Sequence, residues 1–160
     1  MDKNSKIFIA GHTGLVGSAI LRKLKYQNFS NIITQKKSEL DLRNQNQVRL
    51  YIKNKKPNIV IIAAAKVGGI IANFENQADF IYDNIMIQTN LINAAKENKI
   101  KNLIFLGSSC IYPKYCKQPI KEKYLFNGKL EISNQAYALA KISGIQMCSS
   151  YNFQYGLNYK

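Results

Sequence analysis

Four side chains in the second half of this chain have the types and the spacing needed to move protons at a carbonyl group. Tyr137 and Lys141 are four residues apart in a stretch that reads as helix, so their side chains share one face. A phenol ordinarily has a pKa of about 10 and is a weak acid–base group at neutral pH. We expect the ammonium of Lys141 to favour the phenolate and to lower the pKa of Tyr137. The phenol is then suited to give a proton to a carbonyl oxygen while the carbonyl carbon is reduced.

Ser108 and Cys110, which follow the strand-like run 103–106, supply the other two side chains. Ligands of parallel sheets bind beyond the carboxyl ends of the strands, where Ser108 would donate a hydrogen bond to the same carbonyl oxygen. Side chains alternate along an extended chain, so we expect Ser109 to point away and Cys110 to share the face of Ser108. A thiol has an ordinary pKa of about 8.5 and suggests a second proton-transfer step at this place. The alternative for Cys110 is a small buried residue at the end of a strand.

The segments that must position these side chains alternate between strand and helix. Strands are expected at 6–10, 31–34, 59–64 and 103–106, and helices at 15–25, 44–54, 78–98 and 135–155, the last capped by Ser133 or Asn134. This order predicts the α/β class, with a Rossmann-like, doubly wound parallel sheet. A fifth strand should begin within 155–160, so we expect the sheet to be incomplete at its C-terminal side, with an unpaired edge after the fourth strand. The irregular stretch 111–134 is long for a loop, which favours a functional role.

A glycine-rich run joins the first strand to the first helix and predicts a site for dinucleotide phosphates. Gly11 permits the tight turn, Gly14 lets the backbone approach a pyrophosphate, and Gly17 lets the helix lie close to the sheet. The free N–H groups and the positive dipole end of the helix favour the phosphates. The expected cofactor-binding residues of this run are Gly11, His12, Thr13, Gly14, Leu15, Val16 and Gly17. For His12, a solvated position in the turn is the alternative to a phosphate contact.

The segment after the second strand favours NADP over NAD. An acidic residue there would accept hydrogen bonds from the ribose of NAD, but residues 34–38 hold Lys36 and Lys37 and no acid. Lys37 or Lys36 is therefore expected near the 2′-phosphate of NADP. Asp41 comes next, and one role open to it is to cap the helix expected at 44–54.

Composition and charge argue against several classes of function. The net charge of +14 comes mostly from lysines scattered along the chain, so we expect no nucleic-acid partner; the excess charge instead helps to attract a phosphate-bearing ligand. Three cysteines without metal-site spacing and a single histidine favour free thiols and no metal site. No apolar run approaches the ~20 residues of a membrane span and the N-terminus has no leader character, so we expect a cytoplasmic protein with no membrane partner.

Five motifs resemble those of the GDP-L-fucose synthases, a family in the NAD-dependent epimerase/dehydratase group of the extended short-chain dehydrogenases. They are residues 11–20 (GHTGLVGSAI), 63–70 (AAAKVGGI), 78–84 (ADFIYDN), 106–113 (LGSSCIYP) and 137–141 (YALAK). The resemblance covers essentially all 160 residues. It implies an NADP-dependent enzyme that epimerises C3 and C5 of a GDP-sugar substrate, GDP-4-keto-6-deoxy-D-mannose, and reduces C4 to give GDP-L-fucose.

The resemblance also assigns roles to residues. It makes Cys110 one member of the epimerising acid–base pair. It places further residues by the cofactor or the sugar, namely Asp41 at the adenine amine, Ala64, Lys66, Tyr137 and Lys141. Asn84 either helps there or has an interior polar role. Thr13 stands where some members carry Arg, so Lys37 must supply the 2′-phosphate contact.

The resemblance implies a homodimer formed through the helices at 78–98 and 135–155. It places the partner His of the acid–base pair, with the substrate domain, beyond Lys160. We therefore expect residues 1–160 to be a truncated NADP-binding Rossmann domain that is inactive in epimerisation by itself. One alternative is another nucleotide-sugar epimerase or dehydratase, against which Cys110 argues. The other is a non-catalytic dinucleotide-binding module, against which the joint presence of Ser108, Tyr137 and Lys141 argues.

Overall fold

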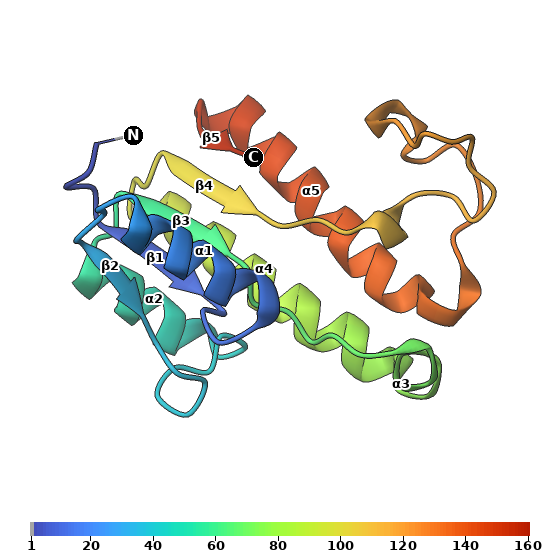
Figure 1. The fold of residues 1–160 in the computed structure, drawn as a ribbon, viewed down its shortest axis with the longest axis horizontal. Coiled ribbons are helices and arrows are strands. Elements are labelled where there is room, and N and C mark those ends of the chain that lie inside the picture. Colours follow the sequence, from blue (N-terminus) through green and yellow to red (C-terminus); the bar gives the residue numbers. More distant parts are fainter. Residues whose placement is uncertain (1) are drawn as a thin grey trace.

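Five parallel strands form the centre of the structure, a computed structural model that describes residues 2–160 (Figure 1). They are β1 (Ile7–Ala10), β2 (Ile32–Thr34), β3 (Ile59–Ile62), β4 (Asn102–Phe105) and β5 (Asn158–Tyr159). The strand order is β2-β1-β3-β4-β5, and every neighbouring pair is parallel. The expected doubly wound α/β sheet is confirmed.

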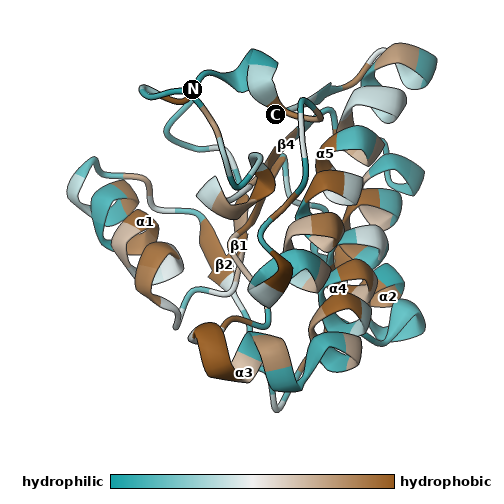
Figure 2. Cartoon of the chain, turned by 90° about the vertical axis from the view of Figure 1, so that its right-hand side faces the viewer, coloured by the Kyte–Doolittle hydropathy of each residue, from teal (hydrophilic) through white to brown (hydrophobic). Residues whose placement is uncertain are grey.

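Helices cover both faces of this sheet. They are α1 (Leu15–Tyr26), α2 (Gln45–Lys55), α3 (Ile70–Glu75), α4 (Gln77–Glu97) and α5 (Gln135–Tyr155). Figure 2 shows α1 on one side of the sheet and α2, α4 and α5 on the other. Side chains of β1 and β3 alternate between the two layers, because Ile7 and Ile9 face the α1 side while Phe8 and Ala10 face the opposite side. Strands buried on both faces explain the unbroken apolar runs of β1 and β3.

The chain after β4 and the paired helices α4 and α5 form an extension beyond the sheet. In Figure 1, α4 and α5 lie side by side and continue past the ends of the strands, with α3 and the 111–134 stretch at the far end. That stretch is held by an ion pair between Lys114 and Glu131, whose Nζ and Oε2 atoms are 2.8 Å apart. Its backbone also pairs, since Lys114 N–H donates to the Lys129 carbonyl at 2.8 Å.

The structure differs from the sequence expectations at three places in the fold. Helix α3 falls in a stretch where we expected no element, because six residues are too few to show a helical period. Asn134 is the N-cap residue of α5, but its side chain caps no backbone N–H. The edge of β4 is paired, because β5 already forms between Asn158 and Tyr159.

The strand order brings two turns together at the carboxyl end of the sheet. Strands β1 and β3 are neighbours although β2 lies between them in sequence, so the direction of winding reverses between them. Such a reversal opens a crevice at the carboxyl ends of the strands, which is where α/β sheets bind ligands. The turn after β1 and the segment after β3 therefore border one site.

Candidate functional site

The glycine run after β1 forms a tight turn against the neighbouring strand. Gly11 has a φ of +88°, a backbone conformation that favours glycine, and a Cβ there would lie 2.5 Å from the backbone nitrogen of Ala64. A Cβ on Gly17 would overlap the carbonyl oxygen of Gly11. A Cβ on Gly14 would meet nothing closer than the same oxygen at 3.5 Å. Gly11 and Gly17 thus hold the turn and the helix together, while Gly14 leaves the backbone open to a ligand.

Helix α1 begins in this turn at Leu15. Gly14 is its N-cap residue and supplies no side-chain cap. Leu15 and Val16 are exposed, and no acidic residue lies in the first turn. His12 has a buried Nδ1 with no hydrogen-bond partner among residues 2–160. An uncapped helix start beside an open glycine fits the phosphates of a dinucleotide.

The turn after β2 presents the expected lysines to solvent. Lys36 and Lys37 are both exposed and form no ion pair within the part of the chain that the structure describes. The side chain of Glu39 folds back onto this turn and accepts from the Lys36 N–H at 3.2 Å. Lys37 lies close enough to Asp41 for its charge to contribute to lowering that carboxyl's pKa. Lys37 is therefore free to meet a phosphate.

Asp41 does not cap a helix. The N-cap of α2 is Asn44, whose side chain accepts from Gln47 N–H. The carboxylate of Asp41 instead accepts from the guanidinium of Arg43, at 3.0 Å from Nε and 2.9 Å from Nη2. These hydrogen bonds are the main reason that the pKa of Asp41 is lowered. The capping alternative is wrong, because the carboxylate of Asp41 forms stronger, bidentate hydrogen bonds with the guanidinium of Arg43.

The segment after β3 is held by helix α4. The buried side chain of Asn84 accepts from Lys66 N–H at 2.9 Å and donates to the Lys66 carbonyl at 3.0 Å. The Lys66 ammonium lies 2.8 Å from Asp79 and 3.4 Å from Asp83, and the Asp79 carboxylate is the main reason that its pKa is raised. Of the two roles open to Asn84, the structure shows the interior one. Ala64 borders Gly11, on the opposite side of the same crevice.

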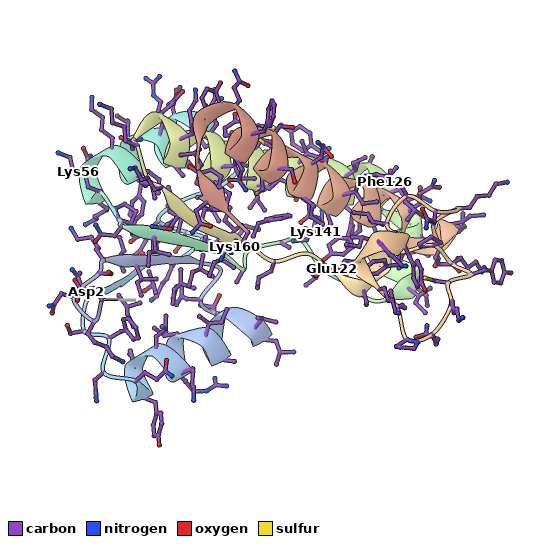
Figure 3. The ribbon with its side chains drawn as sticks, turned by 90° about the horizontal axis from the view of Figure 1, so that it is seen from above. Asp2, Lys56, Glu122, Phe126, Lys141 and Lys160 are labelled. Atoms are coloured by element: carbon purple, nitrogen blue, oxygen red, sulfur yellow. The ribbon has the colours of Figure 1, made fainter. Side chains whose placement is uncertain are left out.

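Tyr137 and Lys141 share one face of α5, as their spacing predicts. Lys141 is 3% exposed, and its ammonium donates to the Leu106 carbonyl at 2.8 Å and lies 5.9 Å from the centre of the Tyr137 ring. Figure 3 shows Lys141 at the exit of β4, far from Asp2 and Lys56 at the opposite end of the sheet. Burial lowers the pKa of Lys141 to about 8.

The expected effect of Lys141 on the phenol is wrong for this structure. Burial raises the pKa of Tyr137; its interaction with the Ser108 side chain lowers it, and the Cys110 thiol raises it further. The ammonium of Lys141 faces a carbonyl and the flat side of the ring, so it does not offset the cost of burying a phenolate.

Ser108, Cys110 and Tyr137 lie together, but not for the reason that strand alternation suggested. Strand β4 ends at Phe105, and Ser109–Ile111 form a 3-10 turn capped by Ser108, whose Oγ accepts from Cys110 N–H at 3.3 Å. The turn, rather than a two-residue repeat, carries Cys110 back toward the phenol. Both side chains are close enough to Tyr137 to influence its pKa, Ser108 through a hydrogen bond and Cys110 through its charge.

Sequence reasoning missed the charged and amide side chains that connect the loops of this site. They are Arg43, Asp83 and Asn90. The sequence could have indicated Asp83, because it is four residues after Asp79 and therefore shares its face of the predicted helix. No local pattern predicted the contacts of Arg43 with Asp83 and of Asn90 with the Arg43 carbonyl, because these partners are 40 and 47 residues apart. Among residues 2–160, no group of three His, Cys, Asp or Glu side chains could hold a metal ion, and no helix is long and apolar enough to cross a bilayer.

The chain is similar to curated proteins over almost all of its length. It is 54% identical over 155 residues to "GDP-L-fucose synthase 1" of Arabidopsis thaliana, which covers 97% of this chain and 48% of that protein. It is 49% identical over 155 residues to "GDP-L-fucose synthase" of Escherichia coli (strain K12), again 97% of this chain and 48% of that protein. The chain therefore spans about half the length of the curated relatives that it matches.

A solved structure has the same fold and a similar sequence. It is "MlghC, GDP-mannoheptose C4 reductase from Campylobacter jejuni with NADP bound", with a TM-score of 0.96, 45% identity, and coverage of 99% of this chain and 50% of that one. The sequence pattern of the NAD dependent epimerase/dehydratase family matches residues 7–160. That match begins at β1 and includes the glycine turn, Ser108, Cys110, Tyr137 and Lys141. This chain belongs to the NAD dependent epimerase/dehydratase family.

Proposed function

We propose that residues 1–160 form the NADPH-binding domain of an enzyme that converts GDP-4-keto-6-deoxy-D-mannose to GDP-L-fucose. The observation that carries this proposal is the meeting of Ser108, Cys110 and Tyr137 at the exit of β4, beside the crevice that the glycine turn borders. A hydroxyl and a phenol can donate hydrogen bonds to a ketone oxygen. A thiol can exchange a proton with the carbon next to that ketone. Relatives named GDP-L-fucose synthase and the NADP-bound neighbour support the substrate and the cofactor.

The crevice offers a partner for each part of the cofactor. The glycine turn with the start of α1 suits the pyrophosphate, and the free Lys37 suits the 2′-phosphate. Asp41 would meet the adenine, and the Ala64–Lys66 backbone borders the same half. Tyr137 and Lys141 lie where the nicotinamide ribose would be held. When bound, the cofactor supplies the hydride that reduces C4.

The residues at the exit of β4 supply the proton transfers. A ketone at C4 acidifies the protons at C3 and C5, and Cys110 exchanges a proton with one face of the sugar. Ser108 and Tyr137 donate hydrogen bonds to the oxygen on which negative charge develops. In the reduction, Tyr137 gives its proton to the C4 oxygen, and its raised pKa suits it to keep that proton until then. One site would thus perform two reactions.

The test follows solvent deuterium into the sugar, in the natural polypeptide that carries these residues. Without NADPH, the 4-keto substrate should gain deuterium at C3 and C5, and with NADPH it should yield GDP-L-fucose. Cys110→Ser should slow the exchange by roughly 10²-fold, and Tyr137→Phe should slow the reduction by a similar factor. Cys148→Ser is the matched control, because Cys148 is buried in the core away from the site.

A second candidate is a C4 reduction without epimerisation, which the GDP-mannoheptose C4 reductase neighbour favours. Reduction of a 4-keto GDP-sugar with no deuterium at C3 or C5 would establish it. Failure of the protein to bind NADPH at all would overturn both candidates.

The proposal includes a homodimer and a cytoplasmic location. Exposed apolar side chains on α4 and α5, Tyr82 and Leu139 among them, are available for a second copy of the chain. Cys110, Cys116 and Cys148 are all free thiols, which fits a reducing compartment.

A further inference from the structure

Five charged side chains of alternating sign form one continuous ion-pair network at the carboxyl end of the sheet. In spatial order they are Asp41, Arg43, Asp83, Lys66 and Asp79. Asp83 is the middle member, and its side chain is 14% exposed. One of its oxygens accepts from Arg43 Nη1 at 3.2 Å, and the other lies 3.4 Å from Lys66 Nζ. A single carboxylate on α4 therefore joins two cations from different loops.

The two loops that Asp83 joins are those proposed to hold the adenosine half of the cofactor. Arg43 lies between β2 and α2, two residues after Asp41, and Lys66 follows β3 in the segment that borders Gly11. Helix α4 also fixes the backbone of each loop separately. Asn84 binds the Lys66 backbone, and Asn90 donates to the carbonyls of Leu42 and Arg43 at 3.0 and 2.9 Å.

Loss of the Asp83 charge divides this ion-pair network into two separate ion pairs. Arg43 keeps Asp41, and Lys66 keeps Asp79, but the loops share no remaining ion pair among residues 2–160. Asn84 and Asn90 still bind the two loop backbones to α4, so the protein should remain folded. The change removes the ion-pair link between the two loops and leaves their spacing to the backbone contacts with α4.

We infer that Asp83 is a positioning residue, which acts through Arg43 and Lys66 to hold the two adenosine-side loops at the spacing that NADPH requires. This inference rests on the proposed cofactor and goes beyond it, since Asp83 itself need not touch the ligand. It distinguishes Asp83 from Asp79, whose only ion pair among residues 2–160 is with the same lysine.

The test compares Asp83→Asn with Asp79→Asn by calorimetric titration with NADPH and with 2′,5′-ADP, the adenosine half alone. Asp83→Asn keeps the side-chain volume and removes the charge. We expect it to weaken both ligands by about tenfold, and Asp79→Asn to weaken them less than about twofold. The ligand-free melting temperature should fall by less than about 4 °C in either variant. Hydrogen exchange of the ligand-free protein should speed up at residues 42–44 and 65–67 in Asp83→Asn only.

A second variant breaks the same link from the other side. Arg43→Gln should weaken 2′,5′-ADP as Asp83→Asn does, and the double variant should be no weaker than either single one, because both remove one connection. Additive losses, equal losses in Asp79→Asn, or unchanged exchange at both loops would overturn the inference. If the unaltered protein binds neither ligand, the proposed function fails, and the cofactor role of Asp83 fails with it. Binding by the unaltered protein with unchanged affinity in Asp83→Asn overturns the inference alone.

Discussion

Lys141 is the residue whose environment departs most from that of a surface lysine. The residue is 3% exposed, its ammonium donates to the Leu106 carbonyl, and the centre of the Phe105 ring lies 4.6 Å from that ammonium. Among residues 2–160, no carboxylate pairs with it. Burial therefore lowers its pKa to about 8, and the protein loses stability in order to keep this charge beside Tyr137.

A measurable pH dependence follows from this pKa. Between pH 8 and the ordinary lysine pKa of 10.5, the unfolded chain binds more protons at this residue than the folded one, so this group adds stability as the pH rises. Lys141→Met should remove that dependence. The stability of the unaltered protein relative to the variant should rise by about 3 kcal/mol between pH 7 and pH 10.5. Urea unfolding at the two pH values measures it.

The control for this measurement is Lys53→Met, at an exposed position of α2. Its stability relative to the unaltered protein should stay within about 0.5 kcal/mol across the same range. If the difference in unfolding free energy between the unaltered protein and Lys141→Met did not change with pH, burial would not lower the pKa of Lys141.

At the scale of elements, the contact between helix α1 and strand β1 decides whether the phosphate turn exists. The backbone of Gly17 lies so close to the Gly11 carbonyl that a methyl group would overlap it. Gly17→Ala should destabilise the protein by about 2–3 kcal/mol and abolish NADPH binding, because either the turn or the helix must move. Chemical unfolding and a cofactor titration measure the two effects.

Gly69 offers a matched control for that substitution. It is the N-cap residue of α3 with a φ of −67°, and a Cβ there would meet nothing within 4 Å. Gly69→Ala should change stability by less than about 0.5 kcal/mol. Similar losses in both variants would mean that the glycine contact at the turn is not what holds α1.

At the scale of the whole molecule, α4 and α5 extend past the sheet and leave apolar side chains uncovered. Leu139 lies near the start of α5 and is 44% exposed. If the proposed homodimer forms through these helices, sedimentation of the natural polypeptide should give twice the mass of one chain. Leu139→Asp should reduce the mass to that of one chain, because a carboxylate in an apolar interface loses its hydration.

Leu50→Asp controls for the general effect of a new surface charge. Leu50 is 54% exposed and lies on α2, which is not one of the two helices of the proposed interface. It should leave the dimer intact. A single-chain mass for the unaltered protein, or equal dissociation in both variants, would exclude this interface.

The sequence by itself determined the order of the strands and of the long helices. Apolar periods are local, so they predicted α5 at Gln135–Tyr155 without error and the other long elements within one or two residues. The glycine spacing likewise predicted a close turn, because only a residue without a Cβ tolerates the φ of Gly11. The assignment of Cys110, Tyr137 and Lys141 as catalytic residues stays a prediction until the isotope experiment is done.

Only the tertiary structure decided what surrounds those residues. The pKa of Tyr137 depends on burial by segments distant in sequence, and Cys110 reaches it through a 3-10 turn that is too short to leave a period. Asp83 meets Arg43 from 40 residues away, and no local pattern encodes such a pair. Spacing along a chain fixes which side chains share a face, whereas charge and burial depend on which faces the fold brings together.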